Sequence, residues 1–387
     1  MRTISNQKWE YIAFCDAVDI CDTLRKPINS KERSRRIAGK KQSELYPYYG
    51  ATGQVGYIDD YITDGEYVLL GEDGAPFLDA YAPKAYLING KAWVNNHAHV
   101  LRSKKSNKFL CYYLNYFDYK GFVSGTTRLK LTQNSMRQIK IPNPSLLEQE
   151  RIVARIEELF SQLDSGVETL KKIKQQLAVY RQAVLKEAFS ICKEKKTVDQ
   201  VCVHVTDGDH FPPPKAQTGV PFIMISNIKD QKIVWEGTNH VGVDYYNQIG
   251  EKRAPIKGDV LYTVTGSYGI PVLVDFDVKF CFQRHIALLR PNETITQKYL
   301  YYVMQSPEIY QQATDKATGT AQKTVSLSVL RKIEIPYCNL SEQREIVSVL
   351  ESRLSVCDNV EQIVDATLQR AEAMSQSILK SAFEGRL

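Results

Sequence analysis

The sequence predicts an α+β fold in which two globular domains of mixed α/β structure are separated by an antiparallel two-helix coiled coil. Three features predict it: an ungapped internal repeat, a periodic series of apolar residues in each copy, and short β-like runs with Gly and Asp turns elsewhere. With 387 residues, 43% of them hydrophobic, the chain is long enough for two or three domains with their own cores. The predicted domains are residues 1–144 and 197–338, and the predicted helical segments are residues 145–196 and 339–387.

The internal repeat emerges when the sequence is aligned with itself at an offset of 194 positions. Residues 125–189 then match residues 319–383 without a gap. The identical pairs include Gly125/Gly319, Thr126/Thr320, Arg137/Arg331, Pro142/Pro336, Glu148/Glu342, Gln149/Gln343, Asp164/Asp358 and Lys186/Lys380. Because this period is far longer than that of solenoid repeats, it indicates the duplication of a domain-sized unit.

Each copy of the repeat predicts a long amphipathic helix. Ser145-x-x-Glu148 and Asn339-x-x-Glu342 are N-terminal capping patterns, and each follows a β-like run that contains Pro. Apolar residues then recur every three or four positions, and we call this series the seam. Its members are Ile152, Ile156, Leu159, Leu163, Leu170, Ile173, Leu177, Tyr180 and Val184 in the first copy, and Ile346, Leu350, Cys357, Val360, Val364, Ala371, Met374 and Ile378 in the second.

Two arrangements of these helices are compatible with the pattern. Each helix could pack only on its own domain, or the two helices could pack on each other. Matched seams of equal length in one chain favour an antiparallel pair.

The segments before each helix predict the globular domains. The first contains "YVLLGEDGAPFLDAYAPKAYLI" and the second "DVLYTVTGSYGIPVLVDF", both with β-like runs separated by Gly and Asp turns. A faint correspondence links "NNHAHVLR" (Asn95–Arg102) with "QRHIALLR" (Gln283–Arg290). The two domains otherwise differ greatly, so the helices are the similar parts of the chain.

The sequence contains no catalytic motif. It has no GxxxxGK[ST] phosphate loop, no Gly-rich loop spaced for AdoMet, and no nucleophile elbow. His97-x-His99 and Cys202-x-His204 lack further ligands at metal spacing, so we predict neither a metal nor a cofactor. Glu194–Lys196 offers half of a nuclease motif, but we expect these residues to lie on a solvated helix end.

Composition predicts a cytoplasmic protein without a membrane segment. No apolar run approaches the roughly 18 residues of a membrane span, and the first residues lack the apolar core of a signal peptide.

The charge of the chain is moderately positive, with a net value of +6. Lys and Arg exceed Asp and Glu by 7 in residues 1–144, whereas the two signs balance in residues 197–338. A nucleic-acid partner is therefore compatible with the charge but not required by it.

Basic and small polar residues gather in a few predicted loops. Two basic runs, Lys31–Lys41 and Arg102–Lys108, lie in the first domain, and each is compatible with a solvated surface. A Gly-Thr loop precedes each repeated helix, at Ser124–Lys130 and at Thr318–Thr324. Such loops let backbone amides approach phosphates, and Arg128, Gln322 and Lys323 could reach a phosphate or a base edge.

The order of these parts resembles the specificity subunit of type I restriction–modification systems. The resemblance covers essentially the whole chain, and it rests on two different domains that are each followed by an "IxIP…EQxxIV" helix. It implies that each domain is a target-recognition domain that reads one half of an asymmetric bipartite site in double-stranded DNA. The helices would then set the spacing, with half-sites on one face lying roughly 34 Å apart.

The resemblance also implies the partners of the chain. Two modification (methyltransferase) subunits and the restriction (translocase/nuclease) subunits would carry adenine methylation and cleavage, and would bind AdoMet, ATP and Mg. This chain would be a non-catalytic subunit without a cofactor of its own. A stand-alone DNA-binding nuclease or methyltransferase with undetected catalytic residues is the alternative, and a coiled-coil scaffold unrelated to DNA is a third.

The residues expected to contact DNA lie in the Gly-Thr loops, in the turns Tyr48–Gly53, Thr206–His210 and Thr265–Tyr268, and at or beside the two corresponding histidines. They are Tyr48, Tyr49, Gly50, His97, Gly125, Thr126, Thr127, Arg128, Thr206, Asp207, His210, Thr265, Ser267, Tyr268, Arg284, His285, Gly319, Thr320, Gln322 and Lys323.

Overall fold

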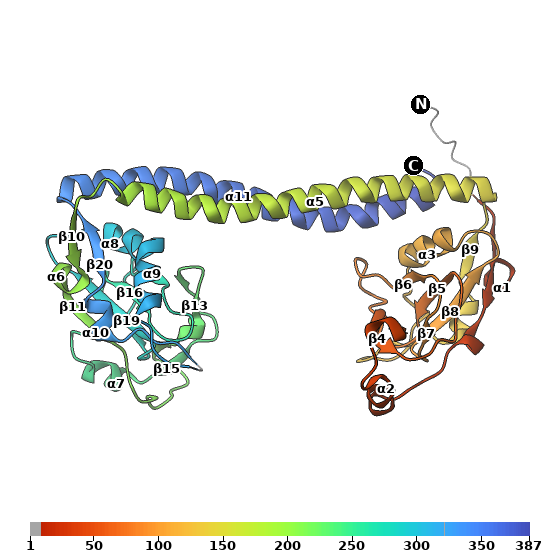
Figure 1. Cartoon of the computed structure of the whole chain (residues 1–387), viewed down its shortest axis with the longest axis horizontal. Helices are drawn as coiled ribbons and strands as arrows, with labels where there is room; N and C mark the ends of the chain where they lie inside the picture. The colour runs from red at the N-terminus through yellow and green to blue at the C-terminus, as the bar shows by residue number, and fades with distance from the viewer. Residues whose placement is uncertain (1–8, 321) are drawn as a thin grey trace. The chain divides into compact units, whose positions relative to one another are not determined.

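The computed structural model describes residues 9–320 and 322–387, which form two compact units (Figure 1). One unit contains the chain up to Lys171 together with Val364–Leu387, and the other contains Lys172–Ile363. Each unit therefore combines one mixed α/β domain with parts of both long helices. The predicted fold class is confirmed in this respect.

The first unit contains two main sheets. One sheet has the strand order β2-β8-β5-β6 and the other has the order β4-β3-β7, while β1 pairs with β9. The strands are β1 (Tyr11–Ala13), β2 (Val18–Ile20), β3 (Tyr46–Gly50), β4 (Gly53–Ile58), β5 (Tyr67–Gly71), β6 (Ala85–Ile88), β7 (Trp93–Val94), β8 (Ala98–Ser103) and β9 (Lys140–Pro142). All pairings are antiparallel except that of β3 with β7.

Short helices accompany these sheets. They are α1 (Phe14–Ala17), α2 (Ser30–Ile37), α3 (Asn107–Tyr116) and α4 (Gln133–Arg137), with 3-10 turns at Asp22–Leu24 and Gln42–Glu44. Helix α3 begins where Ser106 accepts a hydrogen bond from the Phe109 amide, and it covers β5 and β6 with Phe109, Leu110 and Leu114. Burying these large apolar side chains provides the main stabilisation of the domain.

The second unit contains two main sheets that correspond to those of the first. Their orders are β11-β19-β16-β17 and β15-β12-β18, and β10 pairs with β20. The strands are β10 (Glu194–Thr197), β11 (Cys202–Asp207), β12 (Val220–Ile223), β13 (Ile228–Lys229), β14 (Lys232–Ile233), β15 (Asn239–Val241), β16 (Val260–Thr263), β17 (Pro271–Leu273), β18 (Cys281–Phe282), β19 (Ile286–Pro291) and β20 (Glu334–Tyr337). The short helices are α6 (Val198–Val201), α7 (Val243–Gln248), α8 (Gln297–Val303), α9 (Pro307–Asp315) and α10 (Leu327–Arg331), with a 3-10 turn at Ile225–Asn227.

The duplication therefore extends through both domains. In each unit a four-stranded antiparallel sheet accompanies a three-stranded sheet that contains one parallel pair, β3 with β7 and β12 with β18. The faint correspondence between Asn95–Arg102 and Gln283–Arg290 is explained, because these segments contain most of the equivalent strands β8 and β19. The second unit adds the small hairpin β13–β14 and helix α7.

Two long helices, α5 (Leu146–Phe189) and α11 (Leu340–Phe383), contain 44 residues each. The Glu148 amide donates to Ser145 and the Glu342 amide donates to Asn339, as the capping patterns predict. In the second unit Arg181 binds Asp358 and Glu361, while Glu187 binds Arg353. Because residue numbers rise along α5 as they fall along α11, the helices are antiparallel there.

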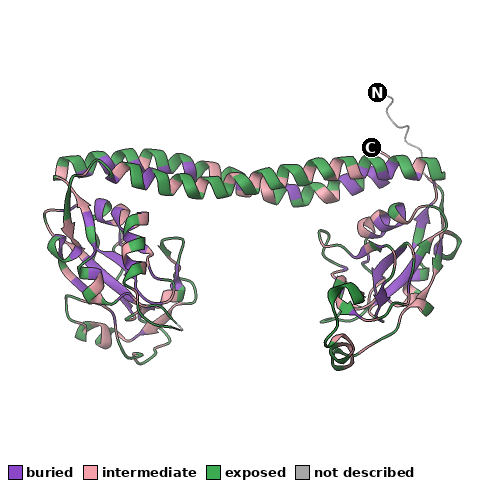
Figure 2. Ribbon diagram, in the orientation of Figure 1, coloured by how far each residue is buried: buried purple, intermediate pink, exposed green. Residues whose placement is uncertain are grey.

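The ends of the long helices belong to the domain cores. Ile152 and Ile156 of α5 join Phe383 of α11 in the core of the first unit, whereas Phe189 of α5 joins Leu350 of α11 in the core of the second. Figure 2 shows this burial at the helix ends and a largely exposed surface along the rest of both helices.

The predicted seam is correct for most positions but wrong at two of them. Tyr180 and Met374 are 49% and 52% exposed. Leu354, which is not among the predicted seam positions, is buried in α11. Apolar spacing alone therefore does not locate every buried position in these helices.

One further prediction is corrected by the structure. Glu194–Lys196 does not lie on a helix end but begins strand β10, which pairs with the "IEIP" strand β20. Strand β1 pairs with the "IKIP" strand β9 in the same manner, so each domain is closed by a strand from its beginning. None of the helices in the described part of the chain is both long and apolar enough to span a membrane.

Candidate nucleic-acid interface

The Gly-Thr loop of the first unit is a small closed hairpin on the surface. Ser124 and Lys130 exchange two backbone hydrogen bonds of 3.0 and 2.8 Å, and the residues between them are mostly exposed. Gly125 has φ +96°, and a side chain there would collide with the Arg128 carbonyl oxygen. Glycine is therefore required to close the loop with its side chains pointing outward.

A turn that follows strand β5 holds this loop in place. The Leu131 amide donates to the Glu72 carbonyl over 2.7 Å, and the Gly74 amide donates to the Leu129 carbonyl over 2.9 Å. The Glu72 amide in turn donates to the His97 carbonyl over 2.8 Å. These bonds bring together three segments that are distant in the sequence, and we call the result the Gly-Thr surface of the first unit.

Side chains on this surface form a compact polar group. His97 Nδ1 lies 2.6 Å from Asp73 Oδ1, and Arg128 Nη2 lies 2.7 Å from the same oxygen. Arg128 nevertheless remains 61% exposed. An open hollow of about 450 Å³ adjoins the group, and its lining includes Gly50, Thr52, Asp73, His97, Thr127 and Arg128. The structure thus brings four of the predicted residues together.

The second unit repeats this arrangement with different side chains. Thr318 and Thr324 exchange hydrogen bonds of 2.9 and 2.7 Å, and Gly319, at φ +105°, would collide with the Gln322 carbonyl oxygen if it carried a Cβ. The amides of Val325 and Gly266 donate to the carbonyls of Val264 and Lys323 over 2.8 and 2.9 Å.

These bonds define the Gly-Thr surface of the second unit, whose third segment contains His285. The Val264 amide donates to the His285 carbonyl over 2.9 Å. Gly319, Thr320, Gln322 and Lys323 are all exposed on this surface, and Ala321 lies outside the described residues.

His285 lies beside the exposed Arg284 on this surface. Burial and the neighbouring Arg284 lower the pKa of His285 below its ordinary value, so the imidazole is neutral at pH 7. A neutral imidazole has one donor and one acceptor nitrogen, which suits hydrogen bonds to base edges. Ser267 is also exposed here, whereas the side chain of Thr265 is buried.

The predicted turn Thr206–His210 forms a separate polar group in the second unit. His210 Nε2 lies 2.9 Å from Asp207 Oδ2, and Arg253 approaches the same carboxylate at 3.7 Å. His210 is exposed, while Thr206 and Asp207 are half-buried at the end of strand β11. Asp207 is thus already paired with a histidine and an arginine.

Two tyrosines predicted to contact DNA lie in the core instead. Tyr48 is 3% exposed and donates to the Ile28 carbonyl, while Tyr268 is 9% exposed and donates to Thr314. The Tyr268 ring also stacks on Tyr310 with centroids 5.6 Å apart. Because aromatic side chains contribute large apolar areas, they are favoured in a core even within a Gly-rich turn. Tyr49 remains half-buried, and burial raises its pKa.

The two basic runs of the first unit have different structural roles. In the run that forms α2, Arg36 and Lys40 both bind Asp59, which holds the pKa of that carboxyl below its usual value. In the second run, Lys105 binds the Pro144 carbonyl and Lys108 binds Glu157 of α5. The second run therefore ties the domain to the start of α5.

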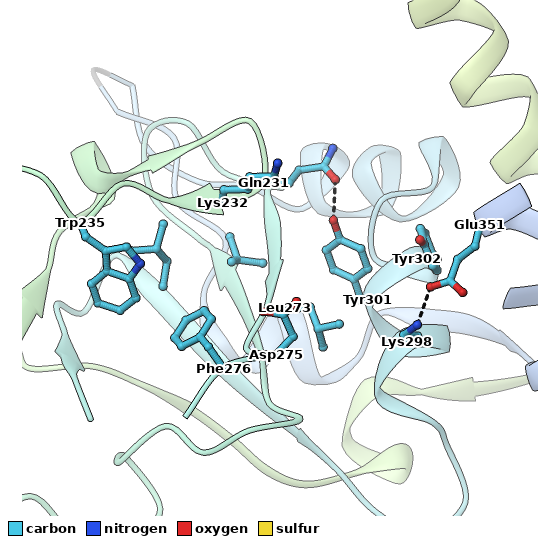
Figure 3. Close-up of a pocket in the computed structure, with 12 residues that line it drawn as sticks. Gln231, Lys232, Trp235, Leu273, Asp275, Phe276, Lys298, Tyr301, Tyr302 and Glu351 are labelled. Carbon is cyan, nitrogen blue, oxygen red and sulfur yellow. Dashed lines mark hydrogen bonds and ion pairs between the residues drawn. The ribbon is translucent and has the colours of Figure 1, made fainter. Parts of the chain in front are cut away.

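A separate hollow of about 500 Å³ lies in the second unit, near the hairpin β13–β14 (Figure 3). Trp235 and Phe276 pack at 5.3 Å on one side, and Tyr301 donates to Gln231 over 3.0 Å on the other. Lys298 and Glu351 form an ion pair of 2.6 Å at its edge. None of the residues predicted to contact DNA lines this hollow, so it is distinct from the Gly-Thr surface of that unit.

Of the two turns that organise these surfaces, Thr265–Tyr268 was predicted to contact DNA, whereas the equivalent turn after strand β5 was not among the predicted contacts. Asp73 and Gly74 follow strand β5, and Thr265 and Gly266 follow strand β16. The sequence did contain a signal for this turn, because a Gly shortly after an apolar β-like run marks a tight turn. In the structure both glycines, Gly74 and Gly266, have φ near +70°. Among the described residues, no group of three or more His, Cys, Asp or Glu side chains is arranged to hold a metal ion.

Comparison with known proteins adds to these observations. A putative type I restriction enzyme specificity subunit of Haemophilus influenzae is 27% identical over 386 residues, covering 96% of this chain and 94% of that protein. The EcoBI specificity subunit of Escherichia coli is 26% identical over 295 residues, covering 68% of this chain and 62% of its own length.

Two solved structures share the fold. One comes from work on complex assembly and conformational transition of the type I R-M system, with a TM-score of 0.70, 18% identity and full coverage of both chains. The other is the HsdS subunit from Thermoanaerobacter tengcongensis, with a TM-score of 0.58, 18% identity, and coverage of 100% of this chain and 99% of that one. The family model for the type I restriction modification DNA specificity domain matches this chain twice, at residues 8–178 and 194–366, and the chain belongs to that family.

Proposed function

We propose that this chain is the non-catalytic specificity subunit of a type I restriction–modification complex. Each domain binds one half of an asymmetric bipartite site in double-stranded DNA. The chain thereby directs adenine methylation or restriction by its partner subunits to that site. Membership of the family supports this proposal over a stand-alone nuclease or methyltransferase.

The observation that carries the proposal is the pair of Gly-Thr surfaces. Both units build the same pattern of backbone hydrogen bonds, yet they present different side chains on it. Arg128, Asp73 and His97 occupy the first surface, and Gln322, Lys323 and His285 lie on the second. One framework with two sets of polar side chains is what the recognition of two different DNA sequences requires.

The proposed DNA surface is narrower than the sequence suggested. It keeps the residues of both Gly-Thr loops, His97, Arg284, His285 and Ser267, with Thr206, Asp207 and His210 at its margin. It leaves out the side chains of Tyr48 and Tyr268 because they are buried. Gly50 contributes as part of the wall of the hollow in the first unit, the half-buried Tyr49 lies next to it in the sequence, and Thr265 contributes through its backbone.

Partners follow from the same proposal. Two modification subunits and the restriction subunits would assemble with this chain in the cytoplasm, and they would bind AdoMet, ATP and Mg. The antiparallel helices would act as a coiled coil that sets the distance between the half-sites. The acidic balance of residues 339–387, where Asp and Glu exceed Lys and Arg by 3, suits α11 to protein contacts and not to DNA.

Base-resolved sequencing of methylated adenines tests the proposal. A host that expresses this chain with its modification subunit should methylate a bipartite motif with unread bases between its halves. A host with the modification subunit alone should lack that methylation. A continuous motif, or methylation that does not depend on this chain, would refute the proposal.

A further inference from the structure

Arg128 and Gln322 occupy the same place in the two units. They lie at the repeat offset of 194 positions, three residues after the glycine that closes each Gly-Thr loop. In each loop the carbonyl of this residue lies against the closing glycine, Gly125 or Gly319. The backbone therefore presents both side chains from equivalent positions.

The side chains also lie across equivalent glycines. A Cβ at Gly74 would sit 3.2 Å from Arg128 Nε, and a Cβ at Gly266 would sit 2.8 Å from Gln322 Nε2. Gly74 and Gly266 have φ values of +72° and +71° and follow equivalent strands. The two units therefore agree in the loop backbone and also in the placement of the polar side-chain group, which lies over the equivalent glycine in each unit.

The chemistry of the two side chains differs in one specific way. Arginine donates two parallel hydrogen bonds to O6 and N7 of guanine in the major groove. Glutamine pairs with adenine instead, donating to N7 and accepting from the N6 amino group. Both side chains are exposed, so each is accessible to a base edge in the unbound chain.

The neighbours of Arg128 favour a base contact over a loose phosphate contact. Asp73 Oδ1 accepts from Arg128 Nη2 over 2.7 Å, and His97 Nδ1 lies 3.4 Å from the same nitrogen. Within the described residues, the hydrogen bonds of this guanidinium run through Nη2, and they fix its orientation. A guanidinium fixed by a carboxylate loses less side-chain entropy when it forms a directional pair of bonds.

We infer that Arg128 and Gln322 are matching specificity-determining residues, and that Arg128 binds guanine in one half-site while Gln322 binds adenine in the other. This inference rests on the proposed function, because it names the bases recognised by the surfaces described above. It also predicts which residues to exchange in order to alter the target.

The test uses the complex of this chain with its modification subunit. The motif methylated by the wild-type complex is first determined by base-resolved sequencing. Arg128→Gln should replace a guanine preference with an adenine preference at one position of one half-site. Gln322→Arg should make the opposite change at one position of the other half-site. On duplexes that differ only at that base pair, each variant should shift the affinity ratio by about 5- to 150-fold.

Arg155→Gln provides the matched control, because it removes the same charge from an exposed position on α5. It should leave both half-sites unchanged. If Arg128→Gln weakens binding and Gln322→Arg strengthens it by the same factor on all sequences, the two side chains contact phosphates and the inference is wrong. An unaltered motif in both variants would overturn it as well. If the wild-type complex has no bipartite motif, the proposed function itself fails, and this result is distinct from the other two.

Discussion

Phe383 provides a direct test of how the chain is assembled, because it lies near the C-terminus yet belongs to the core of the first unit. Its ring packs against Phe109, Tyr113 and Tyr116, each with centroids 5.3 Å away, and it is 4% exposed. Phe189, its counterpart in the repeat, is also 4% exposed but packs against Tyr299 in the second unit. Replacing Phe383 by Ala should therefore destabilise the first unit, and replacing Phe189 by Ala should destabilise the second.

The expected magnitude follows from these contacts. Replacing a buried Phe by Ala costs about 3–5 kcal/mol in lost burial and cavity formation. Phe383→Ala should lie at the upper end of this range because the ring contacts three aromatic side chains, each pair contributing about 0.5–1.5 kcal/mol. Phe189→Ala should lie lower in the range. A loss of 3 kcal/mol raises the population of the open state by about 150-fold.

Peptide-resolved hydrogen exchange of the purified chain, or of its complex, measures these effects separately. Phe383→Ala should accelerate exchange in strands β5 and β8 and leave β16 and β19 nearly unchanged. Phe189→Ala should do the reverse, and it serves as the matched control. Acceleration of β16 and β19 by Phe383→Ala, or equal acceleration of both units by either variant, would refute the assignment of each helix end to one core.

Three further predictions concern single sites. Gly319→Ala forces a residue with a Cβ to φ +105° against a carbonyl oxygen, so it should destabilise the second unit by about 1–3 kcal/mol in urea unfolding; an unchanged midpoint would contradict the role of this loop. Asp259→Ala leaves Arg290 without the carboxylate that binds it at 2.8 and 2.9 Å, and it should cost about 3–5 kcal/mol, whereas a loss below about 1 kcal/mol would contradict a buried pair. Burial opposes ionisation of Asp22, but its hydrogen bond with His99 prevails and lowers the pKa of Asp22. The ionised Asp22 therefore contributes fully to the free energy of unfolding above the unfolded pKa of about 3.9, and this contribution is lost as the pH falls through the lower pKa of the folded state. The stability difference between wild type and Asp22→Asn should thus shrink between about pH 5 and pH 3. A difference that is constant over this range would contradict the assignment.

The long helices could be predicted from the sequence because their signals are local. Capping at Ser145 and Asn339 and the periodic apolar residues depend only on neighbours three or four positions apart. The exposure of Tyr180 and Met374 could not be predicted, because it depends on which side chains of the other helix lie opposite them.

The duplication of the domains themselves was only faintly visible. His97 and His285 correspond at an offset of 188 positions, whereas the helices correspond at 194, because the loops between the strands differ in length. A comparison at one fixed offset cannot follow such shifts. Backbone hydrogen bonds reveal the correspondence, since they depend on strand pairing and not on residue type.

The candidate site was predicted in outline but not in detail. Gly125 and Gly319 were found because a loop that needs a positive φ retains glycine in both copies. The partners of Arg128 could not be found in this way, since Asp73 and His97 reach it only through the pairing of strands β5 and β8. The burial of Tyr48 and Tyr268 is likewise a tertiary effect that the turn-like sequences around them conceal.

The independence of the two recognition domains is the central claim, and exchange of one domain measures it most directly. Residues 1–144 would be replaced by the corresponding domain of another specificity subunit, chosen to retain apolar contacts with Ile152, Ile156 and Phe383. The methylated motif of the hybrid complex would then be determined by base-resolved sequencing. The account predicts a motif in which one half has changed and the other half is the same as in the wild type. A motif that changes in both halves, or in neither, would contradict it.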